Sequence, residues 1–379
     1  MSDLSCLADC VGDLVLFRDL NPVDARLPRF EEAWASMGIQ GPARPRKHEP
    51  AYAQAVVWYL QRARALENHA ARLNEILYIG DTALSDGNAF RNVRAAGDWR
   101  GWAFICSERD EPPSITEQDG VCVANRWSSL PEFISRAAWQ GATLGASTAV
   151  IVDIDKTALG ARGRNDRPID RARLAAMEAM LAEVLGDLWN SALFHDTYSQ
   201  LNVPRFHSFT ADNQDYLAYI CLIVGARVCS LADLQADLAD GRLTNFVDFV
   251  ARTDAQSDGL PTPAVRAAHE EVQARVRAGD PTPFKAFRRR EYLETVCRMG
   301  SLSDRAPLDQ RLREEICLTR EVIELVDWLR NRGCLPLALS DKPDEASVPT
   351  DALASTGCRP LHRAMTHIAG PSIAGQLLG

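Results

Sequence analysis

The sequence predicts an α/β fold, with a parallel sheet, helices packed on it and one large helical insertion. Three observations support this prediction. Apolar runs of strand length alternate with helical patterns from residue 46 to residue 157. From residue 158 to about residue 313, only helical patterns recur. After residue 313, an amphipathic helical pattern and one further apolar run return. We therefore expect a core in two parts, 1–157 and 314–379, separated by a helical segment, 158–313.

Composition and charge restrict the class of protein. A chain of 379 residues with 46% hydrophobic content indicates a globular protein that is long enough for two or three domains or for one core with a large insertion. The net charge of −9 and the lack of a long basic run argue against a nucleic-acid partner. No apolar run reaches the length of a membrane span and no basic leader is present, so we expect a soluble, cytoplasmic protein without a membrane partner. The ten scattered cysteines indicate free thiols. The oligomeric state stays open.

The expected elements of the core follow from periodicity. Pro50 suits the first turn of a helix that begins there, and a second helical piece is expected near 66–73. Apolar runs predict strands at 76–79, 102–106, 121–124, 149–152 and 335–339, and helical patterns lie at 29–37, 88–96 and 130–138. Within the insertion, helices are expected at 169–185, 213–228, 231–238 and 263–276.

The stretch AVIVDIDKT carries the strongest chemical signal. Its apolar run leads directly into Asp153 and Asp155, which places both carboxylates at the carboxyl end of a buried parallel strand. In open α/β sheets, ligands bind beyond these strand ends. Strand alternation puts the two acids on the same side, with Ile154 turned away. Two like charges so close indicate a bound divalent cation, or one acid held protonated to move a proton.

Two further segments pair a strand end with polar residues. KHEP brings Lys47 three residues before the helix at Pro50, and the next strand ends in GDTALSD, with Asp81 and Asp86. The apolar run 335–339 ends at Ser340, followed by Lys342. Glycine lets the backbone turn beside a ligand, and the acid after it is a hard oxygen donor. Taken alone, each segment also fits a surface turn or a common buried strand.

Together these segments resemble the motifs of the haloacid dehalogenase-like (HAD) hydrolases. DIDKT resembles the first motif, LPLALS the second, and KHEP with GDTALSD the third and fourth. The resemblance implies a three-layer Rossmann-like core, with a helical cap inserted after the catalytic strand to close over the site and select the substrate. The motifs occur here in the order third, fourth, first, second, which implies a circular permutation.

The resemblance also implies a function. The implied function is that of a Mg²⁺-dependent phosphatase that hydrolyses a small phosphate monoester through an aspartyl-phosphate. Asp153 would be the nucleophile and Asp155 the general acid and base. The implied Mg²⁺ ligands are Asp153, Asp155, Asp81 and Asp86. The implied phosphate-binding residues are Ser340 and Lys47, with Lys342 as the alternative lysine.

Several alternatives remain open. A phosphotransferase or mutase of the same fold would use the same residues, and a non-catalytic binding protein is compatible with Lys156, where the family often has glycine. An unrelated α/β protein with incidental acidic turns is a third reading. Arg162 and Arg164, close to the DIDKT turn, are candidate substrate ligands or solvated charges. For the three arginines at 288–290, a solvated helix face is favoured.

Overall fold

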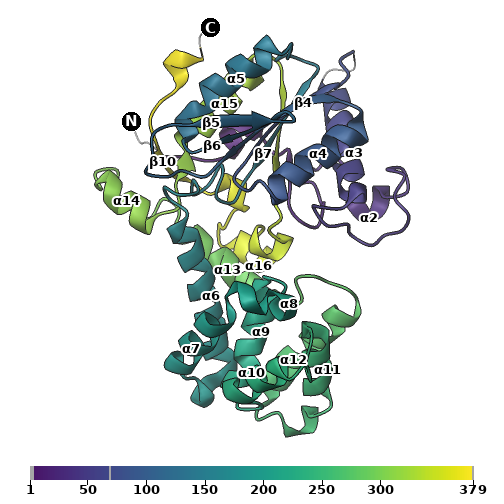
Figure 1. Cartoon of the computed structure of the whole chain (residues 1–379), viewed down its shortest axis with the longest axis vertical. Coiled ribbons are helices and arrows are strands. Elements are labelled where there is room, and N and C mark those ends of the chain that lie inside the picture. Colours follow the sequence, from purple (N-terminus) through teal and green to yellow (C-terminus); the bar gives the residue numbers. More distant parts are fainter. Residues whose placement is uncertain (1–3, 68–69, 378–379) are drawn as a thin grey trace. The chain divides into compact units, whose positions relative to one another are not determined.

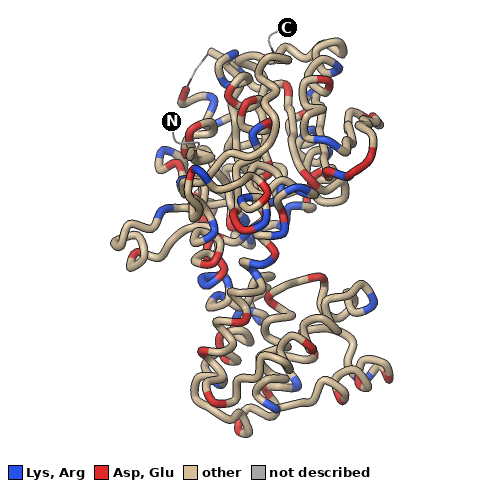
Figure 2. The backbone as a smooth tube through the Cα atoms, turned by 90° about the vertical axis from the view of Figure 1, so that its left-hand side faces the viewer, with Lys and Arg blue, Asp and Glu red and all other residues tan. Residues whose placement is uncertain are grey.

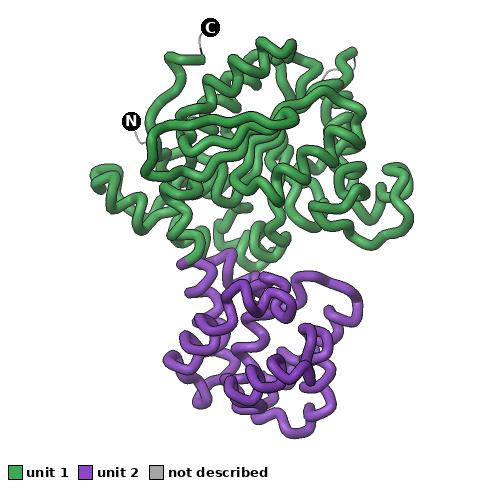
Figure 3. Tube along the Cα trace, viewed as in Figure 1, with its two compact units in different colours: residues 1–170, 295–379 green, residues 171–294 purple. Residues whose placement is uncertain are grey.

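The computed structural model describes residues 4–67 and 70–377, and the chain divides into two compact units (Figure 3). Residues 1–170 and 295–379 form the core unit, and residues 171–294 form the helical unit. The helical unit therefore begins later and ends earlier in the sequence than the expected segment, 158–313. In each unit, Lys and Arg are interspersed with Asp and Glu along the backbone (Figure 2).

A seven-stranded sheet forms the centre of the core unit, with the order β2-β9-β7-β3-β4-β6-β5. All neighbouring strands are parallel except β5, which runs antiparallel to β6. The strands are β2 (Val15–Leu16), β9 (Leu335–Leu339), β7 (Thr148–Asp153), β3 (Glu75–Gly80), β4 (Arg100–Cys106), β6 (Val121–Ala124) and β5 (Ile115–Gln118). The prediction of an α/β fold with a mostly parallel sheet is confirmed.

Helices cover both faces of this sheet. On one side lie α3 (Pro50–Glu67) and α4 (Ser85–Gly97), and on the other lie α5 (Leu130–Trp139) and α15 (Arg320–Asn331) (Figure 1). Alternate residues of the central strands, such as Tyr78 and Ile151, join the apolar cluster under α3 and α4. Both faces of the strands are buried, as expected for a parallel sheet between two helical layers.

Two expectations for the core were wrong or incomplete. The separate helical piece expected near 66–73 is not seen in the described part of this segment: α3 continues unbroken to Glu67, residues 70–74 are non-helical, and residues 68–69 lie outside the described residues. Strand β5 was not predicted. Asp119 and Gly120 adopt positive φ angles of +54° and +78° and join β5 to β6 in a two-residue hairpin. An Asp-Gly pair between two short strand patterns is a strong hairpin signal, so this strand was detectable in the sequence.

Pro336 occupies an interior strand of the sheet, where proline is usually excluded. The N–H groups of Ala338 and Ser340 donate to Leu14 and Leu16, on the β2 side of β9. Because the N–H groups of alternate residues point the same way, Pro336 also faces that side, but β2 begins only opposite Ala338. The missing N–H therefore costs no ladder hydrogen bond.

A small three-stranded sheet joins the two ends of the chain. Its order is β1 (Leu4–Ser5), β10 (Thr366–Ala369) and β8 (Leu318–Thr319), and Leu4 pairs with His367. The remaining helices of the core unit are α1 (Ala8–Val11), α2 (Phe30–Ala33), α14 (Leu308–Glu314) and α16 (Asp351–Ser355). Helix α2 is shorter than the predicted helix 29–37. All ten cysteines are free thiols, as predicted.

The helical unit is built around one buried helix. Residues Leu217–Val224 of α9 are all buried within a single apolar cluster. The helices are α6 (Arg167–Leu185), α7 (Ser191–Leu201), α8 (His207–Thr210), α9 (Gln214–Gly225), α10 (Leu231–Ala239), α11 (Phe246–Asp254), α12 (Pro263–Arg277) and α13 (Lys285–Val296). The four helices predicted here occur within a few residues of the expected bounds. No helix of the described residues combines the length and apolar character needed to cross a membrane.

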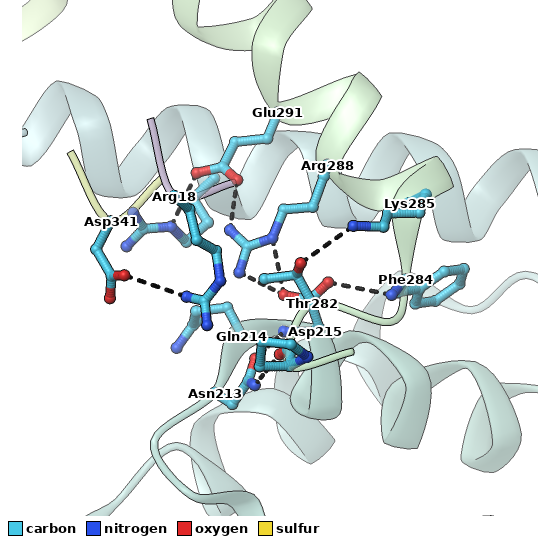
Figure 4. A network of polar contacts seen from close by, with 12 residues as sticks. Arg18, Asn213, Gln214, Asp215, Thr282, Phe284, Lys285, Arg288, Glu291 and Asp341 are labelled. Carbon is cyan, nitrogen blue, oxygen red and sulfur yellow. Dashed lines mark hydrogen bonds and ion pairs between the residues drawn. The ribbon is translucent and has the colours of Figure 1, made fainter. Parts of the chain in front are cut away.

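One arginine of the 288–290 group is buried, which corrects the expected solvated face. Arg288 is 8% exposed. Its Nε donates to Asp215 at 2.8 Å and its Nη1 to Glu291 at 2.6 Å (Figure 4). Glu291 also accepts from Arg173 at 3.1 Å. Arg288 therefore links α13 to α9, and Glu291 links α13 to α6. The two carboxylates supply the negative charge that a buried guanidinium requires. The expected solvated position applies to Arg289, which is exposed.

Candidate active site

Three neighbouring strands bring the predicted polar residues to one edge of the central sheet. In β7, Val152 is level with Ile79 of β3, and Asp153 is level with Leu339 of β9. Asp81 and Ser340 directly follow these two flanking strands. Because all three strands are parallel, their carboxyl ends meet at this edge.

Three carboxylates converge there. One oxygen each from Asp81, Asp86 and Asp153 lies within 4.8 Å of the others, and the three residues are 9%, 1% and 5% exposed. Lys47, in the turn before α3, is 5% exposed and donates to Asp86 at 2.7 Å and to Asp153 at 3.0 Å. Four residues predicted from three separate segments therefore form one buried cluster, in which the lysine contacts two of the three acids.

Asp86 is fully hydrogen-bonded. Its Oδ1 accepts from Lys47 and from the Tyr78 hydroxyl at 3.1 Å, and its Oδ2 accepts from the backbone N–H groups of Asp81 and Thr82, both at 3.0 Å. Asp86 also lies in the first turn of α4, where the helix dipole favours a negative charge. With four donors, Asp86 is suited to order the cluster and to hold a metal ion through water.

Gly80 is required by this packing. A Cβ atom built on Gly80 would lie 2.6 Å from the Cβ of Asp86. Only glycine therefore lets the Asp86 side chain fold back over the end of β3 and reach the amides of the turn.

Asp155 lies beside the second candidate lysine. Its side chain is 24% exposed, and its Oδ2 is 3.7 Å from the Nζ of Lys342. Ser340 is 1% exposed and its Oγ accepts from the backbone N–H of Lys342 at 3.1 Å. Lys47 contacts Asp153 while Lys342 contacts Asp155, so each candidate lysine faces one acid of the DIDKT motif.

The two candidate arginines have different surroundings. Nε of Arg162 pairs with Asp81, and Nη2 lies 3.4 Å from Thr82. Arg164 instead forms ion pairs with Glu108 and Glu321, both at 2.7 Å, and its side chain is 12% exposed. Arg164 therefore has the contacts of a structural residue, and Arg162 belongs to the acidic cluster.

The cluster perturbs the protonation of its members. Burial, with the charges of Asp86 and Asp81, raises the pKa of Asp153 well above its usual value, although Lys47 opposes this. Burial and Asp86 also raise the pKa of Asp81 to about 6, against the effect of Arg162. Burial alone would raise the pKa of Asp86, but Lys47 and the Thr82 amide hold it below its usual value. Carboxylates so close cannot all ionise unless further positive charge is supplied.

Two residues of the site were missed from the sequence. Tyr78 and Thr82 contribute hydrogen bonds to Asp86, and Thr82 Oγ1 also donates to Asp81 at 3.1 Å. A tyrosine inside an otherwise aliphatic strand, two residues before the glycine, was the available signal for Tyr78. For Thr82, one threonine in a polar turn gives no distinguishing signal.

A cavity of about 260 Å³ in the core unit reaches Asp81. It lies at the ends of β4 and β6 and is lined by apolar residues, such as Ile105 and Val123, and by hydroxyl groups, such as those of Ser107 and Thr116. Its size and its mixed lining suit a small group with both apolar and polar parts.

The donor set fits a hard divalent cation. Carboxylate oxygens are the ligands that Mg²⁺ prefers, and Mg²⁺ is usually held by one or two carboxylates together with water. The close, buried oxygens of Asp81, Asp86 and Asp153 meet this requirement. No protein-family model, no curated protein and no solved structure matches this chain, so the assignment of the site depends on its own residues and geometry.

Proposed function

We propose that this protein is a Mg²⁺-dependent phosphatase of the HAD-like type, acting on a small phosphate monoester. The observation that supports it most is the convergence of Asp81, Asp86 and Asp153 within 4.8 Å, with Lys47 Nζ 3.0 Å from Asp153. Asp81, Asp86, Asp153 and Asp155 are faced by Lys47, Lys342 and Arg162. The bases fall one charge short of neutralising the acids. A dication would reverse this sign and so favour an anionic substrate.

Asp153 acts as the nucleophile in this proposal. One carboxylate oxygen forms a bond to phosphorus while the bond from phosphorus to the ester oxygen breaks, which gives an aspartyl-phosphate. Lys47 fixes the orientation of the Asp153 carboxylate. Asp155, which is partly exposed, protonates the leaving oxygen. Asp155 then takes a proton from water as the water oxygen attacks phosphorus, which releases inorganic phosphate and restores Asp153.

The metal would be held by Asp153, Asp81 and the backbone carbonyl of Asp155, with Asp86 through water. When bound, Mg²⁺ supplies positive charge that offsets repulsion between the nucleophile and the phosphoryl group. Ser340 and the two lysines are the proposed contacts of the phosphoryl oxygens.

The order of the strands supports a circular permutation. The strands that carry the proposed fourth and second motifs, β3 and β9, flank β7 in space, although one precedes it and the other follows it in sequence. The pairing of Leu4 with His367 brings the two ends of the chain together, as a permuted fold requires.

We also propose that the helical unit acts as a cap that selects the substrate. It leaves the core unit seventeen residues after Asp153 and returns before β8, so it is inserted directly after the proposed catalytic turn. A closing insertion at this point would exclude water from the reaction.

Hydrolysis of p-nitrophenyl phosphate tests the proposal. The wild type should turn over with Mg²⁺ and not with EDTA, and Asp153→Asn should lose at least about 10³-fold in kcat, as expected for loss of a nucleophile. Asp327→Asn, which changes an exposed acid on α15, is the matched control and should retain wild-type activity. Activity that survives in Asp153→Asn would remove Asp153 as the nucleophile.

The alternatives give different results in the same assay. A phosphotransferase would form a new ester when alcohols or sugars are added, at the expense of inorganic phosphate. A non-catalytic binding protein would bind Mg²⁺ and phosphate without turnover. An unrelated α/β protein would bind neither tightly.

A further inference from the structure

Arg162 and a metal ion would use the same carboxylate. The Nε of Arg162 pairs with Oδ2 of Asp81, and the Thr82 hydroxyl donates to Oδ1 at 3.1 Å. Nη2 of Arg162 also lies 3.4 Å from the Thr82 hydroxyl. Both oxygens of Asp81 are therefore engaged, one of them by a permanent positive charge.

The backbone of Arg162 is fixed, while its side chain has room to move. The N–H donates to the Lys156 carbonyl at 2.8 Å, and the carbonyl accepts from Glu108 N at 3.0 Å and from Trp127 Nε1 at 3.4 Å. At Gly163, a Cβ would lie 2.0 Å from the Glu108 carbonyl oxygen. The loop is thus held against the chain after β4. The Arg162 side chain, however, is 35% exposed.

Arg164 shows the contrasting case two residues later. Its guanidinium contacts both Glu108 and Glu321, and its side chain is 12% exposed. Release of Arg164 would leave Glu321 buried without its cation, which is unfavourable. Release of Arg162 leaves Asp81 without its positively charged partner, and a metal ion bound at Asp81 replaces that positive charge directly.

We propose that Arg162 couples metal binding to phosphate binding at this site. A metal ion must displace the guanidinium from Asp81, and the displaced guanidinium then lies beside a dication of like charge. A bound phosphate removes this penalty, because it faces both cations and accepts the two N–H groups of the arginine fork. Metal alone therefore binds weakly, and metal with phosphate binds well. This inference rests on the proposed function and makes Arg162 a ligand of the substrate phosphate.

Calorimetric titration with Mg²⁺, with and without saturating inorganic phosphate, tests the coupling in the full-length protein. In the wild type, phosphate should tighten Mg²⁺ binding by at least about fivefold, the lower range for coupled sites, and Mg²⁺ should tighten phosphate binding by the same factor. Arg162→Gln should bind Mg²⁺ alone about five- to tenfold more tightly, in line with loss of one charge-assisted contact. The coupling factor should then fall towards one.

Two further variants distinguish the specific ion pair between Arg162 and Asp81 from the effect of any positive charge near the site. Arg109→Gln removes an exposed arginine that lines the cavity at Asp81, and it should leave the Mg²⁺ affinity without phosphate within about twofold of the wild type. Arg162→Lys keeps the charge and should retain part of the coupling. Circular dichroism spectra confirm that each variant is folded.

The outcomes distinguish this inference from the proposed function. Unchanged or weaker Mg²⁺ binding in Arg162→Gln, or equal effects of Arg162→Gln and Arg109→Gln, would overturn the coupling while leaving a functional phosphatase. A wild type that binds no Mg²⁺ and hydrolyses no phosphate ester removes both.

Discussion

Replacement of Lys47 by methionine tests the electrostatics of the cluster most directly. Lys47 is 5% exposed and forms two charge-assisted hydrogen bonds, at 2.7 Å to Asp86 and 3.0 Å to Asp153. Methionine matches its length but leaves Asp86 and Asp153 without the cation that they share. Loss of one partner from a buried ion pair costs about 3–5 kcal/mol. Protonation of Asp153 relieves part of this, so we expect a loss of about 3 kcal/mol in metal-free protein.

Thermal unfolding by calorimetry, in EDTA and in Mg²⁺, measures this loss. For a unit of this size, about 3 kcal/mol lowers Tm by roughly 6–12 °C. Mg²⁺ should restore more stability to Lys47→Met than it adds to the wild type, because Asp86 and Asp153 in the variant no longer have the lysine that neutralises part of their charge. Lys285 supplies the control. It is 3% exposed, lies 3.1 Å from Asp280 in the helical unit, and its methionine variant should show no extra response to Mg²⁺. A Tm change within about 2 °C in Lys47→Met, or a smaller Mg²⁺ effect than in the wild type, would refute this reasoning.

Three other predictions follow from the structure. Because the pKa of Asp81 is raised to about 6, the folded state binds more protons than the unfolded state between about pH 4 and 6. The stability of the metal-free protein should therefore fall as pH rises through that window, and the stabilisation by Mg²⁺ should grow. Measurements of Tm in EDTA and in Mg²⁺ across this pH range check both results. Lys156 has a φ angle of +63°, so Lys156→Gly should be about 1 kcal/mol more stable than Lys156→Ala in urea unfolding, and equal stability would exclude strain there. Gly80→Ala should displace Asp86 and weaken Mg²⁺ binding at least about tenfold, whereas Gly87→Ala, whose Cβ would meet only a flexible arginine at 3.6 Å, should leave Mg²⁺ binding unchanged.

The strand ends of the site could be predicted because each has a local signature. An apolar run followed at once by an acid or a serine fixes both the strand and the edge at which its polar residue lies. This is why Asp81, Asp153 and Ser340 are predicted at strand ends from sequence, whereas the prediction that these ends lie together depends on the resemblance to the hydrolase family. The Asp-Gly hairpin before β6 has an equally local signal.

The pairing of charges could not be predicted in the same way. Arg162 and Asp81 are 81 positions apart, and the sequence around either residue does not indicate that the two form an ion pair. Arg162 and Arg164 have the same charge and nearly the same sequence surroundings, but one loop places them on different acids. The burial of Arg288 could not be predicted for the same reason, because its partner Asp215 lies on another helix, 73 residues away. Such contacts depend on tertiary packing, which periodicity does not encode.

The position of β7 between strands from opposite ends of the chain has a consequence for biosynthesis. Its neighbour β3 has already left the ribosome when β7 emerges, so that side can pair at once. The other side must wait for β9, 186 residues later, which at ordinary translation speeds is about 10–40 s. Throughout that interval, a strand whose central residues are alanine, valine and isoleucine has an open hydrogen-bonding edge, the kind of surface that promotes aggregation of nascent chains. Slow synthesis of residues 171–294 should therefore increase the dependence of the growing chain on chaperones.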